Sequence, residues 1–551
     1  MTLLRGLARL VDPTRRLRQR LLLSRAKHPG LAGHPRTALR IARLVPALAY
    51  DAVRFFASDD APDDVAQRRR AGFDRLARQL RARAPRTLAV GAALHDVVSD
   101  AAFVAAHRVP FQYRDHVRAH LPVAGVLAES DGVRVRDLDG NWAFDLGGSY
   151  GVNLFGNEFY RRCIDRGVAR ARELGAVLGA YHPIVLDNAR RLRAVSGLDE
   201  VSFHMSGTEA VMQAVRLARY HTGRARVVRF CGAYHGWWDG VQVGVGNPRP
   251  ARDVLTLAEL SPTTLEVLRT RDDIACVLVN PIQAMHPNQA PPVDSTLLTG
   301  ERTAGLDRAA YARWLADLRA VCSERGIVLI LDEVFLGFRL ARGGAQEYFG
   351  VRADLVTYGK SLGGGLPVGV VCGRRDLMRR FRDERPADIC FARGTFNAHP
   401  YVMATMHEFL VHLDDPAVLA GYAGLDALWD GRARRLNERL ARLGLPLRVA
   451  GMPAIWTTVY TQPGRYHWMF QYYLRAAGLA PGWIGSGRFI FPNDLSDADF
   501  AAIADRFVAA AEAMEGDGWW WTAGMNGAAI KRRAARELLA AAVRRVASFA
   551  R

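Results

Sequence analysis

The sequence predicts an α/β protein with a mostly parallel central sheet, helices on both faces of that sheet, and a smaller α+β domain. Its 551 residues, half of them apolar and 24% charged, are enough for sizeable cores and too apolar for a disordered chain. Between residues 200 and 375, short apolar runs alternate with helical stretches. Apolar runs flanked by helices are typical of strands that are buried on both faces of a parallel sheet.

The two ends of the chain are predicted to be helical and basic. Residues 1–105 are rich in Arg, Ala and Leu at helical spacing, and we expect a helical basic extension there. An acidic stretch at residues 59–64 marks a loop or a helix start within it. Residues 519–551 begin with Trp519-Trp520-Trp521 and continue as a basic amphipathic tail helix.

The smaller domain is expected in two pieces, at residues 106–175 and 401–518. From about residue 120, alternating segments are separated by the turn signals Asp131-Gly132 and Asp139-Gly140, which predicts a small antiparallel sheet. The second piece shows a mixed α+β pattern with a long helix that ends near Leu443.

The large domain is expected at residues 176–400. One helix runs from the end of the first strand to about His221, and another covers residues 307–325. The predicted strands lie at 201–205, 227–230, 275–279, 327–334, 354–360 and 368–373.

The formal net charge of +20 is concentrated at the ends of the chain. Residues 1–90 carry +13 and residues 519–551 carry +6, which leaves +1 for the 428 residues between them. This distribution argues against a nucleic-acid-binding fold, whose basic face would be built into the body. Two hypotheses stay open. In the first, the basic ends recruit an acidic partner, which is either an anionic membrane surface, with the tryptophans as a membrane contact, or an acidic carrier protein. In the second, the ends are structural helices whose arginines are simply solvated.

Cysteine usage and hydropathy predict a cytoplasmic protein, with peripheral attachment to a membrane as the alternative. The six cysteines are scattered without a CxxC pair, which indicates reduced thiols and neither a metal site nor a disulfide framework. No run of about 18 apolar residues occurs. Arginines interrupt the N-terminal segment too often for a secretory signal.

Only three of the 75 basic residues are lysines, namely Lys27, Lys360 and Lys531. Because Lys27 and Lys531 lie in the basic ends, Lys360 is the only lysine of the neutral body. Arginine replaces lysine where a solvated charge suffices, but not where a neutral primary amine must act as a nucleophile. Composition leaves two interpretations of Lys360, a chance survivor or a functional amine.

Polar side chains lie where the predicted strands end, and α/β sheets bind ligands at such ends. Ser206 and Thr208 follow the first strand and, with the N–H groups of the next helix, form a phosphate cup; they would also serve as an ordinary helix cap. Asp332 ends a very apolar strand and needs a positive partner. That partner is either Arg339 or the protonated pyridine nitrogen of a cofactor.

Lys360 and Tyr234 complete the pattern. Lys360 ends the next strand and precedes a glycine-rich segment, while Tyr234 offers an aromatic face after the strand at 227–230. A phosphate cup, a strand-end aspartate, a strand-end lysine and an aromatic platform describe a site for pyridoxal phosphate. The lysine would form a Schiff base with this cofactor, and the aspartate would keep the ring nitrogen protonated.

Residues from about 110 to 515 resemble the class III aminotransferases of fold type I, and within them the glutamate-1-semialdehyde aminomutase branch. The matching segments occur in the order of the family: LDGNWAFDLGGSYG (138–151), MSGTEAVMQAVRLAR (205–219), GAYHGWWDG (232–240), LDEVFLGFR (331–339), YGKSLGGGLPVGVVCGR (358–374) and GTFNAHP (394–400).

The resemblance implies catalytic and phosphate-binding roles. Lys360 would be the Schiff-base lysine and the proton shuttle, and Asp332 would pair with the pyridine nitrogen. Ser206, Gly207 and Thr208 would bind the phosphate.

The resemblance also implies contacts with the ring and with a partner subunit. Tyr234 would stack on one face of the cofactor ring, and Val334 would pack against the other. Thr395 would reach the phosphate of the partner subunit, since the family forms homodimers with sites at the interface.

The chain departs from the family pattern on the substrate side. The Glu-Pro of the family is Asn280-Pro281 here, and the third residue after the aspartate is Phe335. We infer that catalysis is retained on a different substrate, with Tyr150, His235 and Phe335 as candidate substrate contacts. For Tyr150, a packing aromatic is the open alternative.

The sequence therefore predicts an aminotransferase that moves an amino group between an amine or amino acid donor and a keto or aldehyde acceptor, in specialised or lipid-linked metabolism. One alternative is an aminomutase, which keeps the intermediate and returns the amine to a neighbouring carbon. Another is a catalytically inactive binding or scaffold relative, against which the intact Lys360 and Asp332 argue. The expected cofactor is pyridoxal 5′-phosphate, and no metal is expected.

Overall fold

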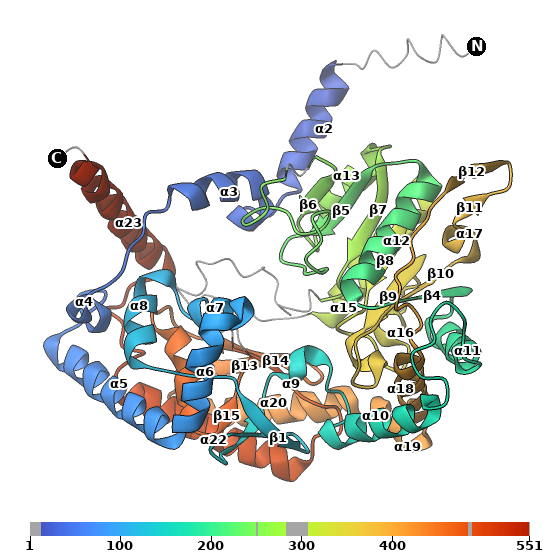
Figure 1. Cartoon of the computed structure of the whole chain (residues 1–551). Helices are drawn as coiled ribbons and strands as arrows, with labels where there is room; N and C mark the ends of the chain where they lie inside the picture. The colour runs from blue at the N-terminus through green and yellow to red at the C-terminus, as the bar shows by residue number, and fades with distance from the viewer. Residues whose placement is uncertain (1–12, 250–251, 283–306, 483–486, 550–551) are drawn as a thin grey trace. The chain divides into compact units, whose positions relative to one another are not determined.

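The computed structural model describes residues 13–249, 252–282, 307–482 and 487–549 (Figure 1). These residues form two compact units. Unit 1 contains residues 13–43, 163–249, 252–282 and 307–419, and unit 2 contains residues 44–162, 420–482 and 487–549. These boundaries differ from the predicted ones. The extension expected at residues 1–105 is divided between the two units after residue 43.

Unit 1 is built on a seven-stranded sheet in the order β4-β10-β9-β8-β7-β5-β6 (Figure 1). Strands from β9 to β6 pair in parallel, and β10 pairs antiparallel with both β4 and β9, so the mostly parallel sheet is confirmed. The strand β6 was not predicted, because this edge strand has only four residues. The strands span Glu200–His204 (β4), Arg226–Phe230 (β5), Val254–Leu257 (β6), Ile274–Val279 (β7), Val328–Asp332 (β8), Leu355–Gly359 (β9) and Gly369–Gly373 (β10).

Helices with one apolar face cover this sheet. α12 (Gly207–Thr222) packs on β4 and on β7 to β10, α15 (Arg308–Arg325) packs on β8, and α11 (Ile184–Ser196) packs on β4 and β10. α12 begins at a serine cap and ends at Gly223, which has a positive φ. The elements that lie mainly in unit 1 also include α2 (Pro13–Arg25), η1 (Leu31–Gly33), α3 (Pro35–Leu44), α10 (Asn157–Ala171), α13 (Pro262–Thr270), α16 (Gly344–Phe349), η2 (Lys360–Gly363), α17 (Arg375–Met378), β11 (Phe381–Arg382), β12 (Arg385–Ile389) and α18 (Pro400–His412). α19 (Pro416–Ala423) is divided equally between the two units.

Unit 2 combines two small sheets with helices from distant parts of the chain. β1 (Leu127–Asp131), β2 (Arg134–Asp137) and β3 (Trp142–Asp145) are antiparallel, as the Asp-Gly turns predict, and β15 (Leu479–Ala480) joins β3 in parallel. The second sheet has the order β13-β14-β16. Its strands and the helices of unit 2 are β13 (Leu447–Met452), β14 (Ile455–Tyr460), β16 (Arg488–Ile490), α4 (Ala52–Phe56), α5 (Asp63–Arg83), α6 (Pro85–Val97), α7 (Ser99–Ala106), α8 (Phe111–His120), α9 (Gly148–Gly151), α20 (Leu425–Arg442), η3 (His467–Met469), α21 (Phe470–Ala476), α22 (Asp497–Gly516) and α23 (Gly527–Phe549).

Aromatic residues from both ends of the chain build the core of unit 2. The ring of Phe55 lies 5.4 Å from that of Phe73 and 6.4 Å from that of Trp519, centre to centre, in edge-to-face contacts. Trp519 and Trp520 are only 1% and 2% exposed. This burial corrects the prediction that the tryptophans form an exposed contact with a membrane.

A network of charged groups fixes α23 to the rest of unit 2. The fully buried guanidinium of Arg465 donates to Glu537 of α23 at 3.0 Å and lies 2.8 Å from the carboxylate of Asp59. The hydroxyl of Tyr50 also donates to Glu537. The C-terminal helix is therefore an integral element of unit 2, which favours the structural interpretation of this basic end.

No single helix in the described ranges is long and apolar enough to cross a membrane. α6 and α7 together meet the same criterion of length and composition, but the pair bends by 112°. Both helices lie in unit 2 and expose some apolar side chains, among them Val97 and Phe103.

Candidate active site

Four chain segments of unit 1 converge at the carboxyl ends of its strands. A Cβ atom on Gly207, after β4, would lie 2.6 Å from the side chain of Val334, which follows β8. One on Gly236, after β5, would lie 2.4 Å from the hydroxyl of Thr208, and one on Gly359, at the end of β9, would lie 3.2 Å from Val334. Such close approaches at 207 and 236 need glycine. The fold thus brings together the segments in which the cofactor contacts are predicted.

Asp332 lies at the end of β8 and is 2% exposed. Its Oδ2 is 2.7 Å from Nδ1 of His235, and its Oδ1 accepts hydrogen bonds from the hydroxyl of Thr357 (3.1 Å) and the N–H of Val334 (3.2 Å). Burial lowers the pKa of His235, so the ring is neutral and donates through Nδ1. Arg339, one of the two predicted partners, does not contact this carboxylate, and the described residues offer it no cation.

His235 does not lie where a substrate contact would be. Its ring is buried, with 2% exposure, and it faces Asp332. The preceding residue, Tyr234, is 48% exposed. The two neighbouring side chains thus differ in exposure, with His235 in the interior and Tyr234 at the surface. The structure therefore replaces the predicted substrate contact of His235 with a contact that orients Asp332.

Ser206, Gly207 and Thr208 form a half-exposed turn at the start of α12. The hydroxyl of Ser206 accepts the N–H of Glu209 at 3.3 Å, so the helix-cap interpretation is correct. The N–H groups of the first helical turn have no partner within the helix, which also makes this end attractive to an anion. The cap and the phosphate cup are compatible functions of the same turn.

Lys360 directly follows β9 in a left-handed backbone conformation, with a φ of 47°. This conformation is strained for a residue other than glycine and is typical of functional positions. The Nζ atom of Lys360 lies 5.7 Å from the ring centre of Phe335. Phe335 is buried, and it lines the surroundings of the amine as a substrate-side residue of the site would.

The remaining predicted residues lie at exposed positions. Burial and, to a lesser extent, the charge of Asp332 raise the pKa of Tyr234. Thr395 is exposed in unit 1. Tyr150 is 60% exposed, has a positive φ of 59° and belongs to unit 2, so it lies in the other unit from the residues above. The contacts of Thr395 with a partner subunit and of Tyr150 with substrate stay predictions.

The fold and these side chains define a pyridoxal phosphate-dependent enzyme of fold type I. The model of the class III aminotransferase family matches residues 116–510. A glutamate-1-semialdehyde 2,1-aminomutase of Nitratidesulfovibrio vulgaris is 30% identical over 417 residues, which cover 72% of this chain and 95% of that protein. The chain therefore belongs to the class III aminotransferase family, whose cofactor is pyridoxal phosphate.

Solved structures share this fold. A transaminase with pyridoxal phosphate bound is 27% identical, with a TM-score of 0.60, over 72% of this chain and 93% of that one. A glutamate-1-semialdehyde aminomutase from Pseudomonas aeruginosa PAO1 is 19% identical, with a TM-score of 0.64, over 81% of this chain and 99% of that one. The segments before residue 116 and after residue 510 lie outside the family match.

The side chains present fit pyridoxal phosphate. Asp332 is a buried carboxylate whose described partners are all neutral, so a protonated pyridine nitrogen would supply the positive charge that it lacks. Ser206, Thr208 and the start of α12 would hold the phosphate. Lys360 would provide the primary amine that binds the aldehyde of the cofactor.

Proposed function

We propose that this enzyme transfers an amino group between an amine or amino acid donor and a keto or aldehyde acceptor, with Lys360 as its catalytic amine. The observation that carries the proposal is that Asp332 and Lys360 lie at the carboxyl ends of the adjacent parallel strands β8 and β9. Asp332 is buried and held by His235 and Thr357, and Lys360 is the only lysine of the neutral body. A protein that only bound ligands or partners would not need a carboxylate held by His235 and Thr357. This arrangement favours catalysis over the scaffold alternative.

The proposed mechanism assigns each step to a side chain. Pyridoxal phosphate, when bound, supplies the electron sink that stabilises negative charge on the substrate carbon. Asp332 keeps the ring nitrogen protonated, and His235 and Thr357 hold the carboxylate in place. The Nζ of Lys360, as a neutral amine, accepts the proton of the substrate carbon and donates it again.

The binding residues are proposed to fix the cofactor on all sides. Tyr234 stacks on one face of the ring and Val334 packs on the other. Ser206, Gly207 and Thr208 anchor the phosphate. Thr395, exposed in unit 1, reaches the phosphate in a partner subunit, so the proposal includes a homodimer.

An aminomutase of the same fold is the second candidate, since the relative from Nitratidesulfovibrio vulgaris carries that name. The two activities share Lys360 and Asp332 and differ in whether the intermediate leaves the site. An aminomutase converts its substrate without an external amino acceptor, and a transaminase does not. Turnover with and without added keto acid therefore separates the two candidates.

Visible absorbance tests the proposed chemistry. Purified protein is expected to show a visible absorbance band from cofactor bound to Lys360, and this band should bleach with some members of a panel of amines. Lys360→Ala is expected to lose or shift the band and to lose turnover. Arg442→Gln, an exposed change on α20, serves as the control. A protein that stays colourless after pyridoxal phosphate is added would contradict the proposal.

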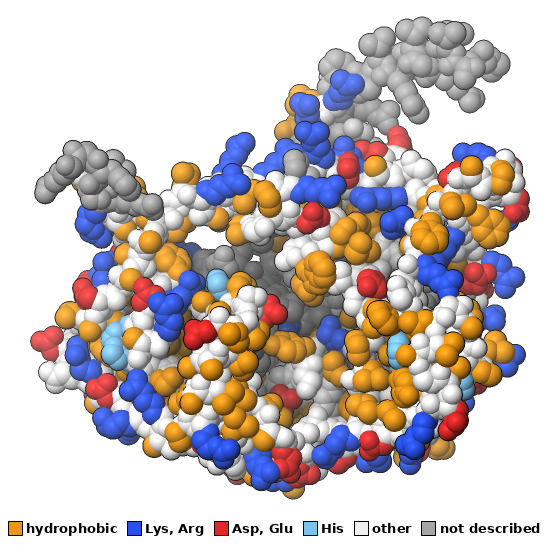
Figure 2. All heavy atoms as spheres, in the orientation of Figure 1, with side chains coloured by type: hydrophobic (Ala, Val, Ile, Leu, Met, Phe, Trp, Pro, Cys, Tyr) orange, Lys and Arg blue, Asp and Glu red, His pale blue; other side chains and the backbone are white. Residues whose placement is uncertain are grey.

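The basic N-terminal helices support a further part of the proposed function. Arg16, Arg18 and Arg20 on α2 and Arg36 and Arg40 on α3 are exposed, and Figure 2 shows Lys and Arg side chains over this part of unit 1. We propose that this surface recruits an acidic carrier protein or an anionic membrane that presents the substrate, in specialised or lipid-linked metabolism. Glu substitutions at 16, 18 and 20 should abolish salt-sensitive binding to an acidic carrier or to anionic vesicles. Unchanged binding to both would exclude this role.

A further inference from the structure

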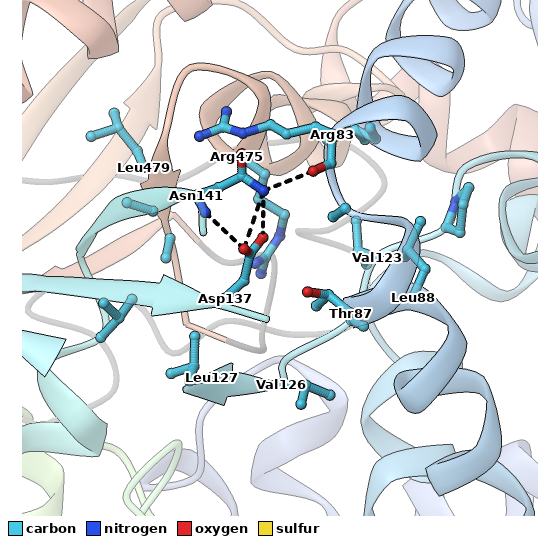
Figure 3. Close-up of a pocket in the computed structure, with 17 residues that line it drawn as sticks. Arg83, Thr87, Leu88, Val123, Val126, Leu127, Asp137, Asn141, Arg475 and Leu479 are labelled. Carbon is cyan, nitrogen blue, oxygen red and sulfur yellow. Dashed lines mark hydrogen bonds between the residues drawn. The ribbon is translucent and has the colours of Figure 1, made fainter. Parts of the chain in front are cut away.

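A cavity of about 130 Å³ lies within unit 2 (Figure 3). One wall consists of residues of α5 and α6, such as Leu88, and the opposite wall consists of the small sheet and the segment before it, such as Val126 and Leu127. Leu479 of β15 and Arg475 at the end of α21 complete it. Because α5 and α6 precede residue 116, this cavity has a wall that the matched family region does not include.

Two arginines, Arg83 and Arg475, line this cavity, and neither has an acidic partner among the described residues (Figure 3). Arg83 donates to the carbonyl oxygens of Ala476 and Trp142, at 3.1 and 3.5 Å. The guanidinium of Arg475 has fewer hydrogen bonds than that of Arg83. The Nη2 of Arg475 donates to the carbonyl oxygen of Pro481 at 3.1 Å, and its Nε is buried without a hydrogen-bond partner. Within the described residues, no carboxylate lies within 4.0 Å of it. Asp137 lines the same cavity, but its oxygens accept hydrogen bonds from Asn141 and from the N–H of Asp139.

Another arginine, Arg108, contacts α21 through its backbone, and its charge acts on Arg475. Gln471, one helical turn before Arg475 on α21, donates to the carbonyl oxygen of Arg108 at 2.9 Å. The Nη1 of Arg108 is buried without a partner. Burial and the charge of Arg108 lower the pKa of Arg475. Two neighbouring cations shielded from water are unfavourable unless an anion joins them.

We propose that this cavity binds a short-chain organic carboxylate, with the carboxylate on the guanidinium of Arg475 and the hydrocarbon chain against Leu88, Val126 and Leu479. A planar guanidinium donates two parallel hydrogen bonds to a carboxylate. The apolar walls favour a hydrocarbon chain over a fully hydrated ion. A cavity of about 150 Å³ holds one benzene molecule, so this one suits a chain of about five or six carbons.

Hexanoate is the probe for this proposal. In calorimetric titrations of the cofactor-loaded enzyme, hexanoate is expected to bind, and Arg475→Gln and Val126→Phe, which fills the cavity, should each weaken binding by about tenfold or more. The matched control Arg442→Gln should bind as the wild type does. Hexan-1-ol, which has the chain without the charge, and inorganic phosphate, which has the charge without the chain, should each bind about tenfold more weakly than hexanoate.

Thermal unfolding without ligand gives a second, independent readout. Arg475→Gln removes an unpaired cation and is expected to raise the Tm, whereas loss of a purely structural arginine would lower it. If Arg475→Gln does not fold, Arg475→Lys and Val126→Phe carry the test. Equal binding of hexanoate to wild type and Arg475→Gln, tighter binding of phosphate than of hexanoate, or no binding up to about 10 mM would each overturn the proposal.

Discussion

Asp332 is a buried carboxylate, and its hydrogen-bond partners among the described residues are all neutral. We expect Asp332→Asn to leave the fold intact, since an amide oxygen still accepts from Thr357 and Val334. The variant should lose about 10²–10⁴-fold in kcat/KM, because the protonated form of the cofactor ring is no longer favoured. Asp317→Asn, an exposed change on α15, is the control. Activity within about threefold of wild type would contradict the role of Asp332.

Glu333, the residue after Asp332, should make stability depend on pH. Burial raises the pKa of Glu333 to about 7. The N–H groups of Ala345 and Gln346 donate to its carboxylate and partly oppose this rise. The folded state therefore binds a proton between pH 4.5 and 7 that the unfolded state releases. The contribution of Glu333 to stability is largest below pH 4.5 and is lost as the pH rises through 7.

Urea unfolding of the Glu333→Gln variant between pH 4.5 and 7.5 checks this sign. The variant should lose the decline in stability that the wild type shows over this range. Glu266→Gln, an exposed change on α13 in the same unit, should keep that decline. An identical pH dependence of Glu333→Gln and wild type would show that Glu333 is ionised throughout.

Sequence motifs sufficed to place Asp332, Lys360 and the turn at residues 206–208 at the carboxyl ends of strands, because the apolar runs before them predict β8, β9 and β4. They did not suffice for His235. Its orientation depends on which side of the chain faces the interior after β5, and that is decided by packing in three dimensions. The contact between Gly207 and Val334 likewise joins segments more than 100 residues apart. No local pattern encodes such a contact.

The start of α12 is a helix end and, in the proposed function, also the phosphate site, so a change there should affect helix stability and cofactor binding in opposite directions. Gly207→Ala adds helix propensity of about 1 kcal/mol, but its Cβ would meet Val334 at 2.6 Å and narrow the cup. We expect weaker binding of pyridoxal phosphate, by about tenfold or more, measured by fluorescence titration. When Val334→Ala is combined with Gly207→Ala, the affinity for pyridoxal phosphate should be partly restored. If it is not restored at all, the clash between residues 207 and 334 is not the cause of the loss.

At the level of elements, apolar periodicity predicted six of the seven strands of the central sheet, and two of the helices of unit 1, within a few residues. The helix expected at 307–325 spans Arg308–Arg325, and the strand expected at 275–279 spans Ile274–Val279. The antiparallel direction of β10 was not predictable, because an apolar run carries no information about direction.

On the scale of the whole molecule, the last 33 residues should be needed for folding rather than for attachment to a surface. Truncation after Gly518 removes Trp519 and Trp520 from the core of unit 2, at a cost of about 3–5 kcal/mol for each large aromatic side chain. We expect this variant to lose the cooperative unfolding transition of unit 2 in calorimetry.

Truncation after Met525 is the matched comparison. It keeps both tryptophans and removes α23, which carries Glu537. Arg465 then loses one of its two carboxylate partners and keeps the other, Asp59. This variant should fold with a lowered Tm. Equal behaviour of the two truncations would show that the tryptophans contribute little to the core.

The domain plan was the least predictable feature, since composition at residues 1–105 and 519–551 resembles that of solvated appendages. The apolar residues that anchor these segments, such as Phe55 and Phe73, are few among many arginines. Their partners come from the opposite end of the chain. Only the folded structure joins them.

The meeting of both chain ends in one core has a consequence for synthesis on the ribosome. At about 5–20 residues per second, Phe55 leaves the ribosome about 20 to 90 s before Trp519 exists. The segment that carries Phe55 and Phe56 therefore waits without its C-terminal packing partners, Trp468 and Trp519, while the residues of unit 1 are translated. A nascent chain with exposed aromatic residues is a substrate for ribosome-associated chaperones. The yield of folded enzyme in a reconstituted translation system should therefore rise when such chaperones are added.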